Sequence, residues 1–355
     1  MKALVLAGGT GTRLRPFSHS MPKQLIPIAN KPVLEHVLSG IKDLGVTEIG
    51  LIVGDREPDI VDALGDGAGL GLSLTYLRQD APRGLAHAVQ VARGFLGDDD
   101  FVMYLGDNML PDGVVEAAEQ FRTHRPAAQV VVQKVADPRA FGVAELDADG
   151  RVTRLVEKPQ EPRSDLAMIG VYFFTSAVHE AVDSIEPSAR GELEITDAVQ
   201  WLVARGSEVR ATEYTGYWKD TGRVEDVLDC NRQLLDQLVR SVDGEVDEES
   251  VLIGPVSVAP GARIVRSFIE GPAVIGPGSV IEDSNVGPHT SIGGDVTLSS
   301  THISYSIALD GASVSGVHAV HGSVIGRSAA VSSGDLVTRR HRLVVGDHTR
   351  IEVAA

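Results

Sequence analysis

The chain begins with MKALVLAGGTGTRLRPFSHSMPKQLIP, residues 1–27, in which an apolar run stops at a cluster of glycines. Gly8, Gly9 and Gly11 have no side chains to keep a ligand away from the main chain, and successive free N–H groups there can form an anion-binding concavity. Two cations follow in the same stretch and supply the positive charge that a polyphosphate requires. The stretch therefore predicts a strand that ends in a triphosphate site.

Two commoner kinds of glycine loop do not fit this stretch. A P-loop needs a lysine directly after its last glycine, and Gly11 is followed by Thr12. A dinucleotide-binding motif needs a third glycine where this chain has Leu14. The two cations that follow the first glycines of this stretch are Arg13 and Lys23. The alternative to a ligand site is a tight turn from strand to loop.

Length and composition set the outer limits. The 355 residues suffice for about two domains with a large core. The net charge of −17 disfavours a general surface for nucleic acid or anionic membranes. Cys230 is the only cysteine, which excludes an internal disulfide and a cysteine-rich metal site. No apolar run reaches the roughly 20 residues of a membrane span, and residues 1–7 lead into the glycine loop instead of forming a signal peptide, so we expect a cytoplasmic protein.

The first two thirds of the chain alternate strands and helices, which predicts an α/β fold with a mixed, mostly parallel Rossmann-like sheet and ligands at the carboxyl ends of its strands. A turn at residues 147–151, DADGR, inserts antiparallel strands. Strands are predicted at 3–6, 48–53, 72–77, 101–105, 129–135, 142–146 and 152–156, and helices at 33–44, 86–95, 114–123, 177–185, 196–205 and 227–242.

The last third has a different pattern. Single apolar residues recur every five or six positions, with Gly, Pro, Ser and Asp between them. A short strand in each repeat that turns its one apolar residue inward gives a parallel β-helix, and a sandwich of short antiparallel strands is the alternative. The predicted inward positions are Ile253, Val258, Ile264, Ile269, Ile275, Ile281, Val286, Ile292, Leu298, Ile303, Leu309 and Val314. We therefore predict a first domain at 1–242, an acidic linker at 243–250 and a β-helix at 251–355.

Two aspartates stand where a metal ligand would be placed. Asp107 follows an apolar strand in FVMYLGDN, at the edge where an α/β sheet binds ligands, although a lone carboxylate there is more often a cap or turn residue. Asp220 lies in GYWKDTG, where an extended backbone puts it on the same face as Trp218. Hard oxygen ligands suit Mg²⁺ on phosphates.

Glu157 and Lys158, in VEKP, end a predicted strand before Pro159. A surface charge pair is the simpler interpretation. Because adjacent strand residues point in opposite directions, both side chains can face one ligand only if the strand ends or kinks at this point.

Together these motifs resemble the sugar-1-phosphate nucleotidylyltransferases. GGTGTRL followed by PKQLIP is similar to the loop that wraps the nucleoside triphosphate in that family, and LGDN and WKDTG are similar to its metal-binding motifs, with one Asp from each. SARGELEITD, residues 188–197, looks like the thymidylyltransferase branch, although its glutamates could simply be acids of a first helical turn. The repeats resemble the hexapeptide repeats of left-handed β-helices, as in the long form of that branch.

The resemblance implies roles for individual residues. Asp107 and Asp220 would bind Mg²⁺, and the catalytic set would be completed by Arg13, Lys23 and Lys158. Gln79 would read the pyrimidine edge, for which its donor and acceptor are suited. The nucleotide would also contact Leu6, Ala7, Gly8, Gly9, Gly11, Thr12, Gln24 and Gly84, and the sugar phosphate Asn108, Gly142, Glu157, Gly170, Arg190 and Trp218. Phe141 stands where relatives often carry Tyr, at the sugar pocket.

The implied reaction joins dTTP and glucose 1-phosphate into dTDP-glucose and pyrophosphate, for deoxysugar synthesis. Two alternatives to this reaction remain open. The enzyme could use UTP or another hexose 1-phosphate as its substrate, or the protein could be a non-catalytic regulator that binds a nucleotide sugar. His289, His302, His318 and His321 lie in the repeats, where a second, acyltransferase activity is the alternative to solvated turn histidines. We expect the β-helix to assemble a homo-oligomer and to carry no chemistry.

Overall fold

The computed structural model describes residues 1–334 and 343–354. It divides into two compact units. The first contains Met1–Gly9 and Leu34–Lys219, and the second contains Thr10–Val33 and Asp220–Ala355. Gly11 and both cations of the opening stretch therefore belong to the same unit as the C-terminal repeats, whereas Gly8 and Gly9 belong to the first unit.

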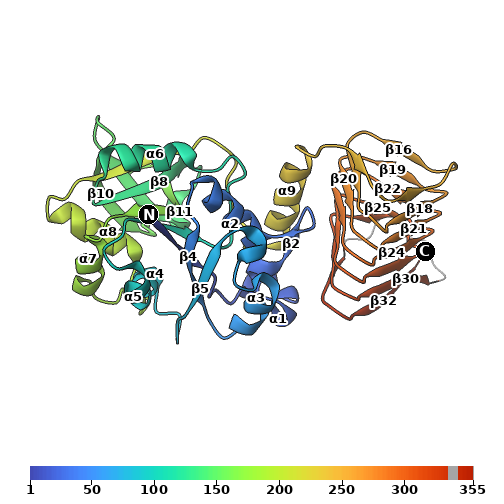
Figure 1. The fold of residues 1–355 in the computed structure, drawn as a ribbon, viewed down its shortest axis with the longest axis horizontal. Helices are drawn as coiled ribbons and strands as arrows, with labels where there is room; N and C mark the ends of the chain where they lie inside the picture. Colours follow the sequence, from blue (N-terminus) through green and yellow to red (C-terminus); the bar gives the residue numbers. More distant parts are fainter. Residues whose placement is uncertain (335–342, 355) are drawn as a thin grey trace. The chain divides into compact units, whose positions relative to one another are not determined.

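The first unit is built on a mixed sheet in the order β10-β9-β11-β6-β1-β4-β5, with β8 beside β11 and β12 beside β8 (Figure 1). β1, β4, β5 and β6 are parallel, whereas β11 is antiparallel to β6. The predicted fold class is confirmed. The bounds are β1 (Lys2–Leu6), β4 (Glu48–Val53), β5 (Ser73–Arg78), β6 (Phe101–Leu105), β8 (Ala128–Lys134), β9 (Gly142–Leu146), β10 (Val152–Glu157), β11 (Leu166–Phe174) and β12 (Val209–Glu213).

Helices pack on this sheet. The predicted helix at 86–95 is two short helices, because the helix is interrupted at Ala92. Strands β11 and β12 and helix α3 were not predicted. β11 is nearly all buried and apolar, so its sequence lacks the alternation that marks a half-buried strand. The bounds are α2 (Val33–Asp43), α3 (Glu57–Leu64), α4 (Leu85–Val91), α5 (Arg93–Leu96), α6 (Val115–His124), α7 (Val178–Ser184) and α8 (Ile195–Ala204). Within the described residues, no helix is long and apolar enough to cross a membrane.

The second unit begins with short elements, two of which carry the cations Arg13 and Lys23. They are the 3-10 helices η1 (Thr12–Leu14) and η2 (Lys23–Leu25), the helix α1 (Phe17–Ser20), and the strands β2 (Pro27–Ile28) and β3 (Lys31–Pro32), which pair as a hairpin. Helix α9 (Val224–Leu235) follows later in the chain, and Figure 1 shows it beside β2. The predicted helix at 227–242 is too long, because α9 ends at Leu235 and Ser241–Val242 is a strand.

The repeats form a three-sided parallel β-helix, as predicted (Figure 1). Each coil adds one short strand to each side. Hydrogen bonds between the corners of neighbouring coils join residues that are 17 positions apart in the sequence. The first side has β14 (Ser241–Val242), β17 (Val256–Val258), β20 (Ala273–Ile275), β23 (Thr290–Ile292), β26 (Ile307–Ala308), β29 (Val324–Ile325) and β31 (Val344–Val345). The second has β15 (Glu245–Val246), β18 (Arg263–Val265), β21 (Val280–Glu282), β24 (Thr297–Ser299), β27 (Ser313–Ser315), β30 (Ala330–Gly334) and β32 (Arg350–Ala354). The third has β16 (Val251–Ile253), β19 (Phe268–Glu270), β22 (Asn285–Val286), β25 (His302–Ser304) and β28 (Val320–His321).

Hydroxyl side chains at the corners hydrogen-bond neighbouring coils to each other. The N–H of Ser284 donates to the Oγ of Ser267 at 3.1 Å, and the N–H of Thr301 donates to the Oγ of Ser284 at 3.1 Å. All three residues are buried, so these bonds satisfy backbone donors that the turn would otherwise leave unpaired. This requirement accounts for Ser267 and Ser284 at the corners of the repeats.

Two details of the repeat prediction differ from the structure. Ile253 is half exposed, because the register pairs Leu252, and not Ile253, with the buried Ile269. A slip of one residue moves a side chain to the other face of a strand. Residues 243–250, predicted as a linker, contain β15, which pairs with β18, so the structure places them in the first coil.

We expect Leu298→Ala to lower the free energy of unfolding by about 2–5 kcal/mol, because it opens a cavity in the fully buried core of the β-helix. The neighbouring Thr297 is exposed, and Thr297→Ala should change stability by about 0.5 kcal/mol or less. Denaturant unfolding of both variants measures the difference. Equal effects at the two positions would contradict the assignment of faces.

Candidate functional site

The cations of the glycine-rich motif lie in residues 10–33, which we call the clamp segment. Gly11 has a φ of +62° and packs against Lys23: a Cβ on Gly11 would lie 2.9 Å from the Cβ of Lys23. The glycine is therefore required twice, by its left-handed backbone and by this close approach. The segment is anchored by Leu14 and Phe17, both buried.

Arg13 meets the second of the predicted metal ligands. Its Nη2 donates to Oδ2 of Asp220 at 3.3 Å, and a Cβ on Gly222 would lie 2.6 Å from the same nitrogen. Arg13 therefore lies across Gly222, beside Asp220. Both side chains are substantially exposed, so the pair contributes little to stability and the guanidinium can rearrange toward an anion.

Gln24 is also in the clamp segment, directly after Lys23. It is 1% exposed, and its Oε1 has no hydrogen-bond partner among the described residues. A buried acceptor without a partner is costly, by about 1–3 kcal/mol. Such groups are typical of sites where a ligand or water completes the bonding.

The first unit carries the rest of the glycine loop. Leu6 and Ala7 are buried at the end of β1, and Gly8 follows them. A Cβ on Gly54, which follows β4, would lie 3.3 Å from the carbonyl oxygen of Gly8. A Cβ on Gly8 would lie 3.8 Å from Oε1 of Gln79. The ends of three neighbouring strands thus converge here.

Gln79 is held by a partner that the sequence did not indicate. Its Nε2 donates to the carbonyl oxygen of Gly84 at 3.2 Å and lies 2.9 Å from Nδ1 of His87. Burial, assisted by the charge of Arg83 and opposed by that of Asp80, lowers the pKa of His87, which favours the neutral ring that accepts at Nδ1. Both amide hydrogens are therefore occupied, and Gln79 offers its acceptor Oε1 instead of the predicted pair.

Gly84 joins this loop to the SARGELEITD segment. It has a φ of +102°, and a Cβ there would lie 2.3 Å from the carbonyl oxygen of Leu193. The N–H of Leu193 donates to the carbonyl oxygen of Arg83 at 2.8 Å, and the N–H of Ala86 donates to that of Leu193 at 3.0 Å. The predicted base-reading loop and the predicted sugar-phosphate segment therefore share one hydrogen-bonded edge.

The SARGELEITD segment meets the end of β10 in a cluster of charges, which we call the Glu157 cluster: Glu157, Lys158, Arg190, Glu194 and Thr196. Arg190 donates from Nη2 to Glu194 at 2.7 Å and to Glu157 at 3.2 Å. Nζ of Lys158 lies 3.4 Å from Oε1 of Glu157. The buried Thr196 donates its hydroxyl to Glu157 at 2.6 Å, a contact that sequence reasoning missed.

The strand ends with a sharp turn between Glu157 and Lys158, as it must if both side chains are to face one ligand. Glu157 ends β10, and Lys158 has a φ of +43°, so the backbone turns sharply between them. A left-handed conformation is uncommon for lysine and is typical of functional positions. This turn lets two adjacent side chains face the same cluster.

Electrostatics keep Arg190 charged. Burial opposes its charged form, but the hydrogen bond and charge of Glu194, with the charges of Glu192 and Glu157, outweigh burial and raise the pKa of the guanidinium. Burial, followed by the charges of Glu194 and Glu157, raises the pKa of Asp197. The cluster therefore holds its cations in place with carboxylates.

Two glycines of the predicted sugar pocket are required by close packing. A Cβ on Gly142 would lie 2.2 Å from Cε of Met168 and 3.2 Å from Oε2 of Glu157. A Cβ on Gly170, which has a φ of +80°, would lie 2.2 Å from Nδ2 of Asn108. That nitrogen donates to the carbonyl oxygen of Ile169 at 2.5 Å.

An aromatic pair completes the predicted pocket. The rings of Phe141 and Trp218 meet edge to face, with centroids 5.2 Å apart. Nε1 of Trp218 is buried and has no hydrogen-bond partner among the described residues, so this donor is available to a ligand. Asp107 lies in the first unit, between β6 and β7 (Asn108–Met109), and Asp220 lies in the second.

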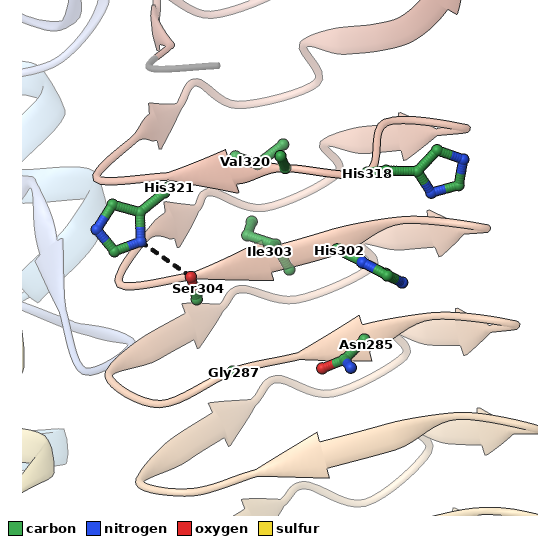
Figure 2. A pocket seen from close by; sticks show the side chains of 9 residues that line it. Asn285, Gly287, His302, Ile303, Ser304, His318, Val320 and His321 are labelled. Carbon is green, nitrogen blue, oxygen red and sulfur yellow. Dashed lines mark hydrogen bonds between the residues drawn. The ribbon is translucent and has the colours of Figure 1, made fainter. Parts of the chain in front are cut away.

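The histidines of the repeats lie in two places. His289 has a φ of +58° and contacts Oδ1 of Asp236 through Nε2 at 2.7 Å. His302, His318 and His321 are exposed on the third side of the β-helix, where they line a pocket of about 240 Å³ (Figure 2). His302 and His321 belong to strands and not to turns.

The pocket has two separate groups of side chains (Figure 2). The rings of His302 and His318 meet edge to face, 5.5 Å apart, and Nδ1 of His321 lies 3.0 Å from the hydroxyl of Ser304. The residues that line the pocket include no carboxylate. The absence of chemistry in the β-helix stays a prediction.

Comparisons with known proteins agree with these motifs. The nucleotidyl transferase family profile matches residues 2–237. The chain is 51% identical to a glucose-1-phosphate thymidylyltransferase of Streptomyces antibioticus, over 99% of both chains, and 51% identical to that of Streptomyces griseus, over 100% of both. A solved putative glucose-1-phosphate thymidylyltransferase from Bacillus anthracis, in complex with a sucrose, is 38% identical, with a TM-score of 0.61 over 65% of this chain and 94% of that one.

Gly84→Ala should lower stability by about 2–4 kcal/mol, because the new Cβ meets the Leu193 backbone and the positive φ disfavours any side chain. Gly94, on α5, has open space around its Cβ position, so Gly94→Ala should be neutral or stabilising by up to about 1 kcal/mol. Thermal unfolding compares the two variants. A Gly84→Ala protein as stable as the Gly94→Ala protein would contradict the close packing described here.

Proposed function

Because the chain belongs to the nucleotidyl transferase family, we propose that it transfers a thymidylyl group from dTTP to glucose 1-phosphate, giving dTDP-glucose and pyrophosphate. The observation that carries the proposal is the 51% identity to curated thymidylyltransferases over the whole chain. The Glu157 cluster and the Gln79 loop supply chemistry that suits the two substrates.

The reaction needs little covalent help from the protein. An oxygen of the sugar phosphate attacks the α-phosphorus of the triphosphate, and the bond from that phosphorus to the departing pyrophosphate breaks. The attacking oxygen is already anionic at neutral pH, so no side-chain nucleophile is required. The protein's task is to hold two anions together and to stabilise the charge that gathers between them.

The cations divide between the two substrates in this proposal. Arg13 and Lys23 bind the triphosphate, and Lys158 and Arg190 bind the sugar phosphate. Arg190 uses Nε and Nη2 for Glu194 and Glu157, and among the described residues no hydrogen bond involves its Nη1. The carboxylates thus fix one edge of the guanidinium and leave the other nitrogen for a phosphate oxygen.

Asp107 and Asp220 are the proposed ligands of a divalent cation. Carboxylates are hard donors that fit Mg²⁺, which is usually bound by one or two carboxylates together with substrate phosphates. Asp220 is about one-third exposed and lies next to the guanidinium of Arg13, which is itself a proposed phosphate-binding group. When bound, Mg²⁺ neutralises phosphate charge and orients the reacting groups.

Base selection is proposed to depend on Gln79. With both amide hydrogens occupied, Oε1 can accept the imino N–H of thymine or uracil, whereas the corresponding ring nitrogens of adenine and cytosine are acceptors. A site built around an acceptor rejects bases that cannot donate to it.

A pyrophosphate-release assay tests the function directly. With glucose 1-phosphate we expect dTTP to give the highest kcat/KM, UTP to be used less well, ATP and CTP to be rejected, and EDTA to abolish turnover. The control is the same panel with galactose 1-phosphate and mannose 1-phosphate. A preference for UTP or for another sugar phosphate would replace the proposed substrates, and no turnover with any pair would favour a binding protein.

The pH dependence tests the role of Gln79. Because the pKa of His87 lies below its usual value of 6.5, the ring is neutral at pH 7 and gains a proton only as the pH falls through that lowered value. Protonated Nδ1 cannot accept, so the amide of Gln79 reorients and the kcat/KM for dTTP should fall at acid pH, relative to that for CTP. In His87→Gln an acceptor persists, and this ratio should stay flat between pH 8 and pH 5. The same pH dependence in both enzymes would exclude His87 as its source.

A further inference from the structure

The clamp segment contains a hairpin with an unusual tip. β2 and β3 are joined by Ala29 and Asn30, which have φ values of +49° and +61°. A two-residue turn with both φ values positive is the type I′ turn, which favours asparagine and glycine. Alanine is a poor residue for this conformation, so the surrounding structure must hold the tip in place.

A single buried amide provides that support. Asn231, on α9, is fully buried, and its Oδ1 accepts from the N–H of Ala29 at 2.9 Å. The same oxygen accepts from the hydroxyl of Ser291 at 2.6 Å, and Nδ2 donates to the carbonyl oxygen of His289 at 3.2 Å. Asn231 therefore joins the hairpin, α9 and the coil of the β-helix that contains β23.

Further contacts connect the clamp segment to the β-helix directly. Nδ2 of Asn30 donates to the carbonyl oxygen of Ile292 at 2.6 Å. Toward the other end of the segment, Nη2 of Arg327 donates to the carbonyl oxygen of Ser20 at 3.3 Å, and a Cβ on Gly346 would lie 3.1 Å from the Cβ of Pro16. Contacts with the β-helix thus fall on both sides of Lys23 in the sequence.

We propose that the β-helix is the platform that holds the clamp segment in the conformation that binds the nucleoside triphosphate. Asn231 is the positioning residue of this platform, and it acts through the Ala29–Asn30 tip on Lys23. The proposal rests on the proposed function in assigning Arg13 and Lys23 to the triphosphate. It goes beyond the sequence-based expectation that the β-helix only assembles the protein.

The physical reason is preorganisation. A flexible segment loses conformational entropy when it closes on a phosphate chain, and a segment that is already fixed loses less on binding. The buried network of Asn231 satisfies the donors and acceptors of three segments at once, so it has one arrangement and not several. Loss of the network should therefore weaken triphosphate binding and leave the Glu157 cluster, in the other unit, unaffected.

The test compares three full-length variants. Asn231→Ala removes the network. Asn30→Gly keeps the left-handed backbone and removes only the bond to Ile292, so it serves if Asn231→Ala does not fold. Ser284→Ala is the control, because Ser284 is buried and its hydroxyl bonds Glu282 and Thr301, both in the β-helix. The readouts are the KM values for dTTP and glucose 1-phosphate, and hydrogen–deuterium exchange of residues 10–33.

We expect Asn231→Ala to raise the KM for dTTP about tenfold and Asn30→Gly about threefold, with the KM for glucose 1-phosphate within twofold. Exchange of residues 10–33 should increase in both variants. Ser284→Ala should lower the melting temperature without either change. Equal rises in both KM values would overturn the platform. Unchanged exchange together with an unchanged KM for dTTP would also overturn it, whether in both variants or in Asn30→Gly where Asn231→Ala does not fold. If the wild-type protein does not use dTTP, the proposed function fails, and the exchange comparison still decides whether the β-helix orders the clamp segment.

Discussion

Parallel strands that are buried on both faces must end at a common edge, and the chemistry of the first unit depends on this constraint. β1, β4 and β6 are almost entirely buried and apolar, so they can be only central strands. The chain leaves that edge at Gly8, Gly54 and Asp107, and the next strand, β5, leaves it at Gln79. Gly8 and Gly54 allow the backbones to approach there, and the side chain of Gln79 lies beside Gly8.

The cations of the candidate site are arranged with carboxylates beside them. Arg190 is held by Glu194 and Glu157, and Arg13 lies against Asp220. A protein with a net charge of −17 repels a triphosphate and a sugar phosphate at long range, so binding depends on a few well-placed cations. The contacts with Glu194 and Glu157 hold Arg190 in place, and in the proposed function this lowers the entropic cost of binding a phosphate.

The second unit combines parts that are distant in the sequence. The clamp segment near the N-terminus and the coils after residue 240 are joined by the amide of Asn231, by the Asn30 bond to Ile292 and by the Arg327 bond to Ser20. Each coil of the β-helix hydrogen-bonds to the next, and at the corners hydroxyl oxygens accept from backbone N–H groups of the neighbouring coil. Such a stack is a suitable support for the clamp segment, which in our proposal holds a flexible, highly charged ligand.

The sequence by itself determined the elements whose patterns are local. The β1 strand with its glycines, the βα alternation and the repeating apolar positions of the β-helix depend on residues that are near one another in the chain. The resemblance carried by short motifs indicated the family. Only the tertiary structure decided that β11 lies in the middle of the sheet, that Ile253 faces outward, that Thr196 and His87 support Glu157 and Gln79, and that the clamp segment belongs with the β-helix. These features depend on contacts between residues far apart in the chain, and composition and spacing do not encode which distant partner a polar side chain will meet.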